Sequence, residues 1–85
     1  MNIRVKSFDE LTIHELYDLL ALRAEIFVVE QDCVYQDLDY MDQQCLHVLG
    51  YVGPTLVAYT RIVPKGLSYE EYVSIGRVGV KIDNR

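Results

Sequence analysis

The stretch that decides the fold is residues 46–63, LHVLGYVGPTLVAYTRIV. Gly53 at the first central position, with Pro54 after it, suits a type II′ turn between two strands. The following segment, Thr55–Val63, is rich in the Val, Thr, Ile and Tyr that strands favour. A strand over Leu46–Val52 would carry His47, Leu49 and Tyr51 on one face and Leu46, Val48 and Val52 on the other. The stretch therefore predicts an antiparallel β-hairpin.

Upstream of the hairpin, the pattern predicts one strand and one long helix. Asn2–Ser7 places Ile3 and Val5 two residues apart between charged neighbours, which is the period of a half-buried strand. Thr12 and Glu15 then have the spacing of a capping box, which indicates a helix start. Two neighbouring stripes follow at helical spacing: Leu16, Leu20, Arg23, Phe27 and Glu30, and Leu19, Leu22, Ile26 and Val29.

Arg23 and Glu30 are charged residues on this otherwise apolar helical face. A charge in such a place is costly unless it is paired. Each residue is therefore expected to meet a partner, such as a charge from the sheet at Arg61 or Arg77. The alternative is functional, with Glu30 forming part of a substrate site at the helix end.

The remaining segments complete a single domain over residues 1–85. Gln31–Gln44 loses the helical periodicity, and we expect a loop or a short second helix there. Val73–Ile82 is a fourth extended segment, interrupted by Gly76 and Gly79. The predicted class is α/β (α+β) with the order β-α-(α or loop)-β-β-β.

The charge balance argues against two classes of partner. The chain has 8 Lys and Arg against 13 Asp and Glu, a net charge of −5, whereas surfaces that bind phosphates are basic. We therefore expect no nucleic acid and no membrane as partner. The longest apolar run is Ile26–Val29 and Met1–Phe8 does not resemble a signal peptide, so a cytoplasmic location with reduced Cys33 and Cys45 is expected.

The apolar terminal strand, Val73–Ile82, is expected to pair with or pack against another segment. An uncovered edge strand exposes unpaired backbone groups. A missing C-terminal half, a second copy of the chain in a homodimer, or a ligand that pairs with the strand could each supply that cover.

No metal site is expected. Asp37, Asp39 and Asp42 lack the glycine and the distal glutamate of an EF-hand loop. Cys33, Cys45 and His47 lack a fourth ligand and the paired spacing of a zinc site.

Several blocks together resemble the ElaA-like branch of the GNAT acyltransferases. They are Leu19–Gln31 (LLALRAEIFVVEQ), Cys33, Tyr35–Asp39 (YQDLD), His47–Gly50 (HVLG), Leu56–Arg61 (LVAYTR) and Ile75–Val80 (IGRVGV). The most specific part is Leu22–Asp39.

The resemblance implies a mixed, mostly antiparallel GNAT-type sheet flanked by helices. It also implies an N-acetyltransferase that moves an acetyl group from acetyl-CoA to a small-molecule or peptide amine. In such proteins the strand matching Val73–Lys81 precedes a phosphate-binding loop, which would begin near Arg85. The chain is therefore expected to be the N-terminal half of the fold, without its C-terminal half.

The same resemblance assigns the acyl-donor site. The backbone of Val78, Gly79 and Val80 would pair with the pantetheine arm, and Arg85 would lie beside the cofactor phosphates. The plainer alternative is that these are buried strand residues. For proton transfer the candidates are Glu71, acting through water, and His47, whose ordinary pKa is near 6.5. The alternatives are that Glu71 is an ordinary surface carboxylate and that His47 is a structural histidine of the core.

The acceptor side is assigned to an acidic loop and two arginines. Asp37, Asp39 and Asp42, with Tyr35 and Tyr40 among them, would attract a cationic amine. Arg61 and Arg77 could bind a carboxylate on the acceptor. The predicted substrate-binding residues are thus Glu30, Tyr35, Asp37, Arg61 and Arg77, and the alternative is a solvated loop.

Two rival functions stay open at this point. One is a non-catalytic half-domain that completes its sheet by pairing with another chain. The other is an acyl-homoserine-lactone-type synthase on the same fold. Such an enzyme would need a surface that binds an acyl carrier protein, and this acidic sequence shows no sign of one.

Overall fold

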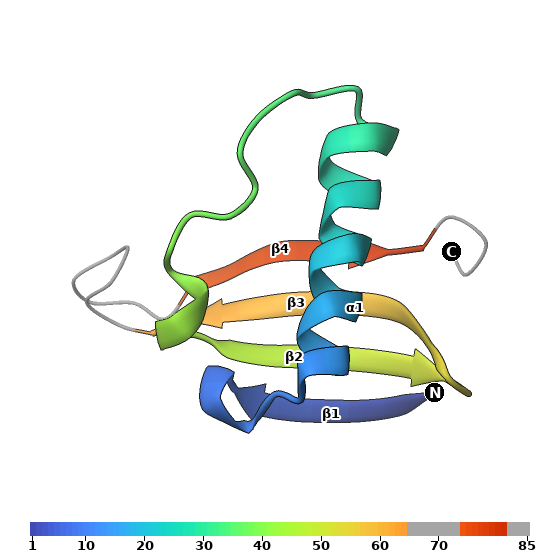
Figure 1. The fold of residues 1–85 in the computed structure, drawn as a ribbon, viewed down its shortest axis with the longest axis vertical. Coiled ribbons are helices and arrows are strands. Elements are labelled where there is room, and N and C mark those ends of the chain that lie inside the picture. Colours follow the sequence, from blue (N-terminus) through green and yellow to red (C-terminus); the bar gives the residue numbers. More distant parts are fainter. Residues whose placement is uncertain (65–73, 82–85) are drawn as a thin grey trace.

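Four antiparallel strands form one sheet in the order β1-β2-β3-β4 (Figure 1). They are β1 (Asn2–Ser7), β2 (Leu46–Val52), β3 (Thr55–Val63) and β4 (Ser74–Val80). The computed structural model describes residues 1–64 and 74–81. The predicted bounds of the first three strands are confirmed, and β4 lies within the predicted Val73–Ile82.

The central hairpin forms through the predicted turn. Val52 pairs with Thr55, so Gly53 and Pro54 are the two loop residues. Gly53 has φ +58°, the left-handed region that the first central position of a type II′ turn requires. Because proline fixes φ near −65°, the second position cannot take the positive φ of a type I′ turn.

The helix begins at the predicted capping box. In α1 (Ile13–Arg23) the Glu15 N–H donates to Thr12 Oγ1 at 3.0 Å, and the Thr12 N–H donates to Glu15 Oε1 at 2.9 Å. Two of the free N–H groups at the helix start are thereby satisfied. A short 3₁₀ turn, η1 (Phe8–Glu10), joins β1 to this helix.

The second half of the predicted helix is a π-helix, η2 (Ala24–Glu30). A π-helix has more residues per turn than an α-helix, so a face counted at 3.6 residues goes out of phase within it. The stripe prediction is therefore wrong at its end, where Val29 is 74% exposed and Glu30 is exposed. Arg23, the last residue of α1, is fully buried as expected.

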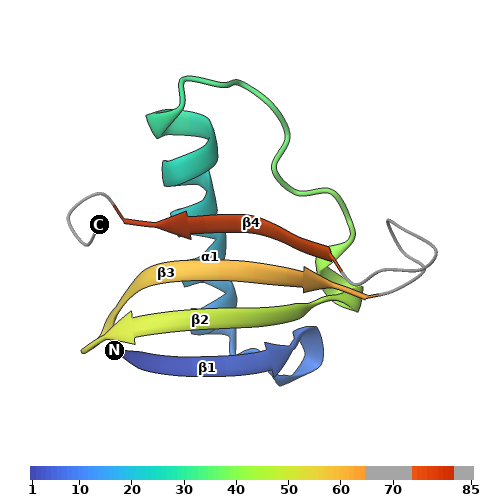
Figure 2. The same ribbon diagram turned by 180° about the vertical axis from the view of Figure 1, so that it is seen from behind.

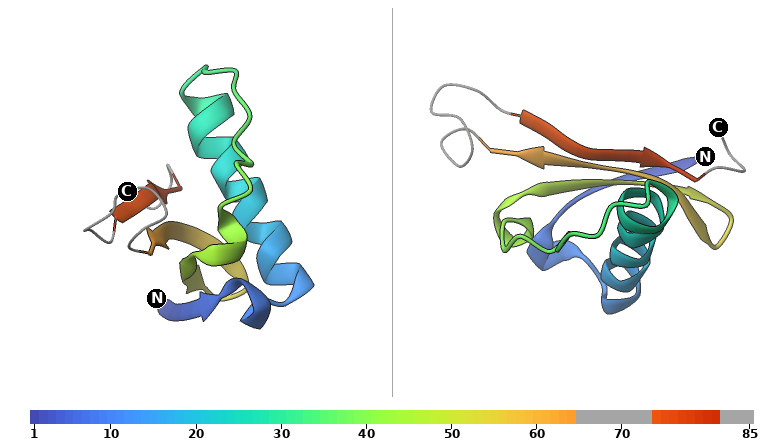
Figure 3. Two further views of the ribbon diagram at one scale, coloured as in Figure 1. Left: turned by 90° about the vertical axis from the view of Figure 1, so that its left-hand side faces the viewer. Right: turned by 90° about the horizontal axis from the view of Figure 1, so that it is seen from above.

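The core lies between this helix and one face of the sheet (Figures 2 and 3). Its buried residues are Leu19, Leu22, Ile26, Leu49, Tyr51, Leu56 and Tyr59. The prediction that His47, Leu49 and Tyr51 share one face of β2 is confirmed, and the structure shows that this face points into the core, since each is at most 4% exposed.

Residues 31–41 form a loop that returns from the end of η2 toward the sheet (Figure 1). One 3₁₀ turn, η3 (Asp42–Gln44), then leads into β2. Of the two predicted possibilities, a loop or a second helix, the loop is therefore correct apart from this single turn.

The other face of the sheet is not covered by any described element (Figure 3). Ile3, Val5 and Val78 are 57%, 58% and 63% exposed. Ile3 and Val78 also line a shallow hollow of about 180 Å³, together with Val48, Ala58 and Val80. Among the described residues, no helix is long and apolar enough to cross a membrane.

Candidate functional site

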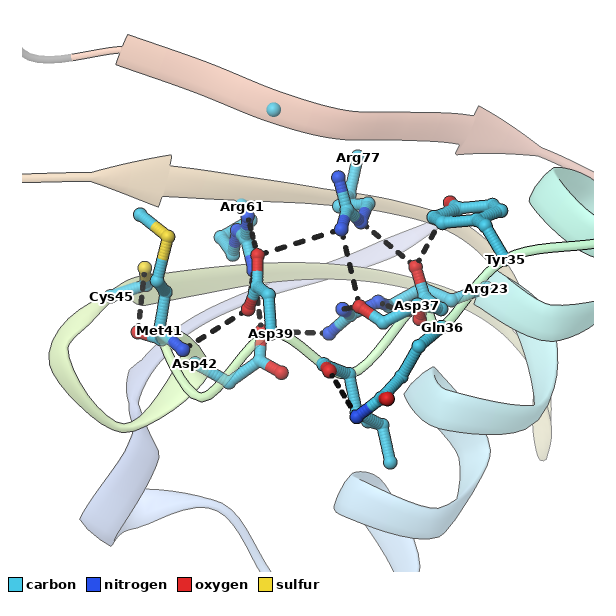
Figure 4. Close-up of polar contacts among 12 residues, drawn as sticks. Arg23, Tyr35, Gln36, Asp37, Asp39, Met41, Asp42, Cys45, Arg61 and Arg77 are labelled. Carbon is cyan, nitrogen blue, oxygen red and sulfur yellow. Dashed lines mark hydrogen bonds and ion pairs between the residues drawn. The ribbon is translucent and has the colours of Figure 1, made fainter. Parts of the chain in front are cut away.

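Three arginines and three aspartates from different elements meet beside β4 (Figure 4). Each aspartate contacts two of the arginines, so the contacts close into a ring. Its members in order are Arg23, Asp42, Arg61, Asp39, Arg77 and Asp37. We call this arrangement the charge ring.

Arg23 is the most deeply buried member of the charge ring. Its side chain has no exposed surface, and its Nη1 donates to Asp42 Oδ1 at 2.7 Å. Its Nε lies 2.8 Å from Asp37 Oδ2, and its Nη2 donates to the Asp37 carbonyl oxygen at 3.1 Å. The charge is thus paired on two sides, as a buried guanidinium requires.

The strands supply the other two arginines. Arg61, on β3, donates to both oxygens of Asp39, at 2.9 and 2.8 Å, and to Asp42 at 3.0 Å. Arg77, on β4, donates to Asp37 Oδ1 at 2.8 Å and lies 3.5 Å from Asp39. The loop is therefore tied to both strands through two-pronged guanidinium contacts.

A β-bulge aims Arg77 at the loop. Tyr59 pairs with Gly79 and Arg61 pairs with Gly76, so Arg77 and Val78 together lie opposite Thr60. Arg77 takes a left-handed φ of +53°, which is strained for a residue with a side chain. Bulges re-aim side chains in this way and are common next to active sites.

The charge ring fixes the ionisation of its members. Burial opposes the charge on Asp39, but hydrogen bonds from Arg61 and from the Met41 N–H outweigh it and lower the pKa of Asp39 to about 2. Burial likewise opposes the charge on Arg61, yet its bonds to Asp39 and Asp42 raise its pKa. These two charges therefore persist at neutral pH.

Three of the predicted acceptor-binding residues already have partners within the charge ring. Asp37, Arg61 and Arg77 are brought together, but they face one another, so each would exchange an existing contact to bind a ligand. Tyr35 lies at the rim, 39% exposed, with Arg77 over its ring at 5.7 Å. Glu30 is exposed at the end of η2. Their substrate-binding roles stay predictions.

His47 occupies a closed position behind the charge ring. It has no exposed surface, its Nε2 donates to the Asp42 carbonyl oxygen at 2.8 Å, and Tyr59 Oη donates to its Nδ1. Burial lowers the pKa of His47 and keeps the ring neutral. In this position it does not reach the surface, and its proton-transfer role stays a prediction.

The predicted acyl-donor residues lie on β4, which is one of the two edge strands of the described sheet. A methyl group placed on Gly79 would lie 2.8 Å from Ile26 Cδ1 and 3.3 Å from Phe27 Cζ. The glycine therefore allows η2 to pack closely on β4, a use of Gly79 that the sequence pattern did not indicate. Val78 is 63% exposed, whereas Val80 is partly buried.

Two of the predicted site residues, Glu71 and Arg85, lie outside the described residues. Their assigned roles stay predictions. In the described part of the chain, no three His, Cys, Asp or Glu residues gather in a way that could hold a metal ion.

A second ion cluster has no counterpart among the expectations drawn from the sequence. Glu15 contacts Lys6 at 2.8 Å and Arg4 at 3.0 Å, which ties the start of α1 to β1. Burial opposes this charge, but hydrogen bonds from Lys6, the Thr12 N–H and Arg4 lower the pKa of Glu15 to about 2. The alternation of Arg4 and Lys6 along β1 was the available signal.

The sequence is similar to those of two groups of curated proteins. It is 43% identical over 81 residues to a UPF0039 protein of Schizosaccharomyces pombe, covering 94% of this chain and 52% of that protein. It is 48% identical over 71 residues to Protein ElaA of Escherichia coli, covering 81% and 46%. The chain thus spans about half the length of these relatives. No protein-family model matches it.

Two crystal structures have the same fold. An acyl-CoA N-acyltransferase from Pseudomonas aeruginosa superposes with a TM-score of 0.92 at 38% identity, covering 100% of this chain and 59% of that one. Escherichia coli ElaA also gives 0.92, at 42% identity, covering 99% and 57%.

Over the residues that it spans, the chain has the fold of the N-terminal part of a GNAT acyltransferase. The resemblance to the ElaA-like branch is confirmed by the relatives that carry that name.

Proposed function

We propose that the chain is the N-terminal part of an N-acetyltransferase that transfers an acetyl group from acetyl-CoA to an amine. The observation that carries the proposal is the superposition of the whole chain on an acyl-CoA N-acyltransferase. The exposed Val78 and the bulge beside it support β4 as the donor strand, because a thioester arm can add to an edge strand through backbone hydrogen bonds.

The proposed reaction is direct transfer. The neutral amine nitrogen attacks the thioester carbonyl, a C–N bond forms, the C–S bond breaks, and coenzyme A leaves as the thiolate. The amine proton passes to a base, for which Glu71 acting through water is our candidate, and the thiolate is reprotonated from solvent. On the acceptor side we keep Glu30, Tyr35 and the charge ring as the residues that border the amine.

Calorimetric titration of the chain with acetyl-CoA tests the donor site. Two substitutions at one position separate backbone from side chain: Val78→Pro removes an N–H, while Val78→Ala keeps it. We expect the proline variant to bind at least about tenfold more weakly, the equivalent of one hydrogen bond at roughly 1.4 kcal/mol, and the alanine variant to bind as the parent does.

Circular dichroism of both variants is the control for folding. Equal losses in the two folded variants would contradict the backbone role of Val78. If neither the chain nor a protein extended to the length of its relatives bound acetyl-CoA, the acetyltransferase proposal would fail.

A second candidate is a non-catalytic half-domain that completes its sheet by pairing with another chain, with a homodimer as its simplest form. The uncovered sheet face favours it, because Ile3, Val5 and Val78 are each more than half exposed. Sedimentation equilibrium tests it. A concentration-dependent mass that Val5→Lys abolishes would support pairing through this face, and a monomer at millimolar concentration would exclude the homodimer.

A further inference from the structure

The side of the long helix that faces away from the sheet is apolar. Ile13 and Tyr17 are 84% and 76% exposed there, and Ala21 and Ala24, which are also exposed, follow over the next two turns. We call these four residues the outer stripe. Figure 3 shows no described element over this side of the helix. A surface helix normally presents polar residues to solvent, so the outer stripe is expected to be a contact surface.

The side chains of the outer stripe decrease in size along the helix. The two large residues lie in its first half, and the two alanines lie in its second half. When two identical helices pack antiparallel, the first half of one lies against the second half of the other. With the two-fold axis between residues 20 and 21, Tyr17 of each copy lies opposite the partner's Ala24. The stripe is therefore complementary in shape to its own reverse.

One flank of the outer stripe adds polar complementarity. His14 and Glu25 are both exposed on this flank, and the two-fold axis brings the same flank of each copy together. With a rise of about 1.5 Å per residue, His14 lies only about 3 Å along the axis from the partner's Glu25. An imidazole N–H can donate to that carboxylate. Asp18, the other carboxylate on this flank, instead accepts a hydrogen bond from Tyr51 at 2.9 Å.

The opposite flank enlarges the apolar surface. A hollow of about 190 Å³ lies there between α1 and the returning loop, with Leu16, Leu20, Leu38 and Tyr40 among its lining residues. Leu38 and Tyr40 are 49% and 79% exposed. A helix laid along the outer stripe would shield part of this hollow from water, which adds to the apolar area that the contact buries.

We propose that two copies of the chain pair through the outer stripe, antiparallel about a two-fold axis, with Tyr17 of each copy packed on the partner's Ala24. A contact of one helix from each copy falls below the roughly 1,200 Å² of a standard interface, so the dimer is expected to be weak. The outer stripe lies on the opposite side of the molecule from the uncovered sheet face (Figure 3). The pairing does not depend on the proposed acetyl transfer.

Sedimentation equilibrium of the chain and two variants tests the pairing. Salt at about 0.3 M screens the net charge of −5 on each copy. Tyr17→Ala removes the large residue from both contacts, and Ala24→Tyr makes tyrosine oppose tyrosine. We expect each variant alone to associate at least about tenfold more weakly than the parent. An equimolar mixture of the two should recover the parent's association, because alanine and tyrosine then oppose each other at both contacts.

Circular dichroism of both variants is the control for folding, and two further variants are the controls for position. Val34→Ala shortens a side chain that is 95% exposed outside the outer stripe, and Val5→Lys places a charge on the uncovered sheet face. Both should associate as the parent does. A parent that is monomeric at millimolar concentration, or a mixture that associates no more strongly than its components, would overturn the proposal. Association that is lost in Val5→Lys but kept in Tyr17→Ala would overturn it in favour of the sheet face.

Discussion

The guanidinium of Arg23 and the carboxylate of Asp42 lie 2.7 Å apart, although the two residues are 19 positions apart in the sequence. Neither side chain is more than 8% exposed. The pair joins the end of α1 to the turn before β2, and η2 and the loop of residues 31–41 lie between the two residues. Removing one partner of a charge pair in such a buried place should be strongly destabilising, because the other charge is then left buried without a counter-charge.

Breaking the buried part of the charge ring should be costly. Asp42→Asn removes the charge shared by Arg23 and Arg61, and we expect the free energy of unfolding to fall by about 3–5 kcal/mol, because a buried guanidinium loses its counter-charge. Arg77→Ala, at a side chain that is 23% exposed, should cost only about 1 kcal/mol. Urea unfolding followed by circular dichroism measures both variants. Equal losses of unfolding free energy in the two would contradict the larger role of the buried pairs.

Stability should fall in acid because of Glu15 and Asp39. Both have pKa values of about 2 in the fold, below their ordinary 4.5 and 3.8. At a pH between the folded and the ordinary pKa, the unfolded chain therefore binds more protons than the folded chain. The stabilisation is complete above about pH 5 and is lost as the pH falls toward 2, with roughly 3 kcal/mol from Glu15. Glu15→Gln, which can still form the capping box, should flatten this part of the profile, whereas the exposed Glu25→Gln should not. Urea unfolding at a series of pH values measures the profile, and an unchanged profile in Glu15→Gln would contradict the assignment.

His47 should add pH dependence at a higher range. Burial lowers the pKa of His47 below 6.5, so below that pH its imidazole is protonated in the unfolded chain before it is protonated in the folded chain. Stability therefore begins to fall below about pH 6.5. Tyr59→Phe removes the donor to Nδ1 of the neutral ring and should move the pKa back upward. NMR titration of the His47 Cε1–H resonance checks both statements, and protonation at or above pH 6.5 in the parent chain would contradict the first.

Gly79 and Gly76 should respond oppositely to alanine. At Gly79 the new methyl group would lie 2.8 Å from Ile26 Cδ1, so we expect a loss of about 1–2 kcal/mol. At Gly76 nothing lies within 4 Å, and alanine should be neutral or slightly stabilising. Adding Ile26→Val, which removes Cδ1, should recover part of the Gly79→Ala loss. Thermal unfolding measures these variants, and additive losses in the double variant would refute the contact.

Local patterns of the sequence determined the strands, the hairpin turn and the start of the helix. The alternation in β2, the Gly53–Pro54 pair and the capping box at Thr12 each follow from backbone sterics over a few residues, and each is confirmed. The resemblance carried by Leu22–Asp39 also identified the fold family from the order of residues alone.

Only the tertiary structure decided what the charged residues do. The sequence showed that Arg23 needed a partner and that the loop was acidic, but it did not join the two observations. Which carboxylate meets which guanidinium depends on distances across three elements, including a bulge that turns Arg77 toward the loop. The exposure of Glu30 likewise follows from a π-helix that packs against Gly79, which local periodicity does not reveal. Short-range backbone preferences depend on neighbouring residues, whereas ion pairing and close packing depend on segments that meet only after folding.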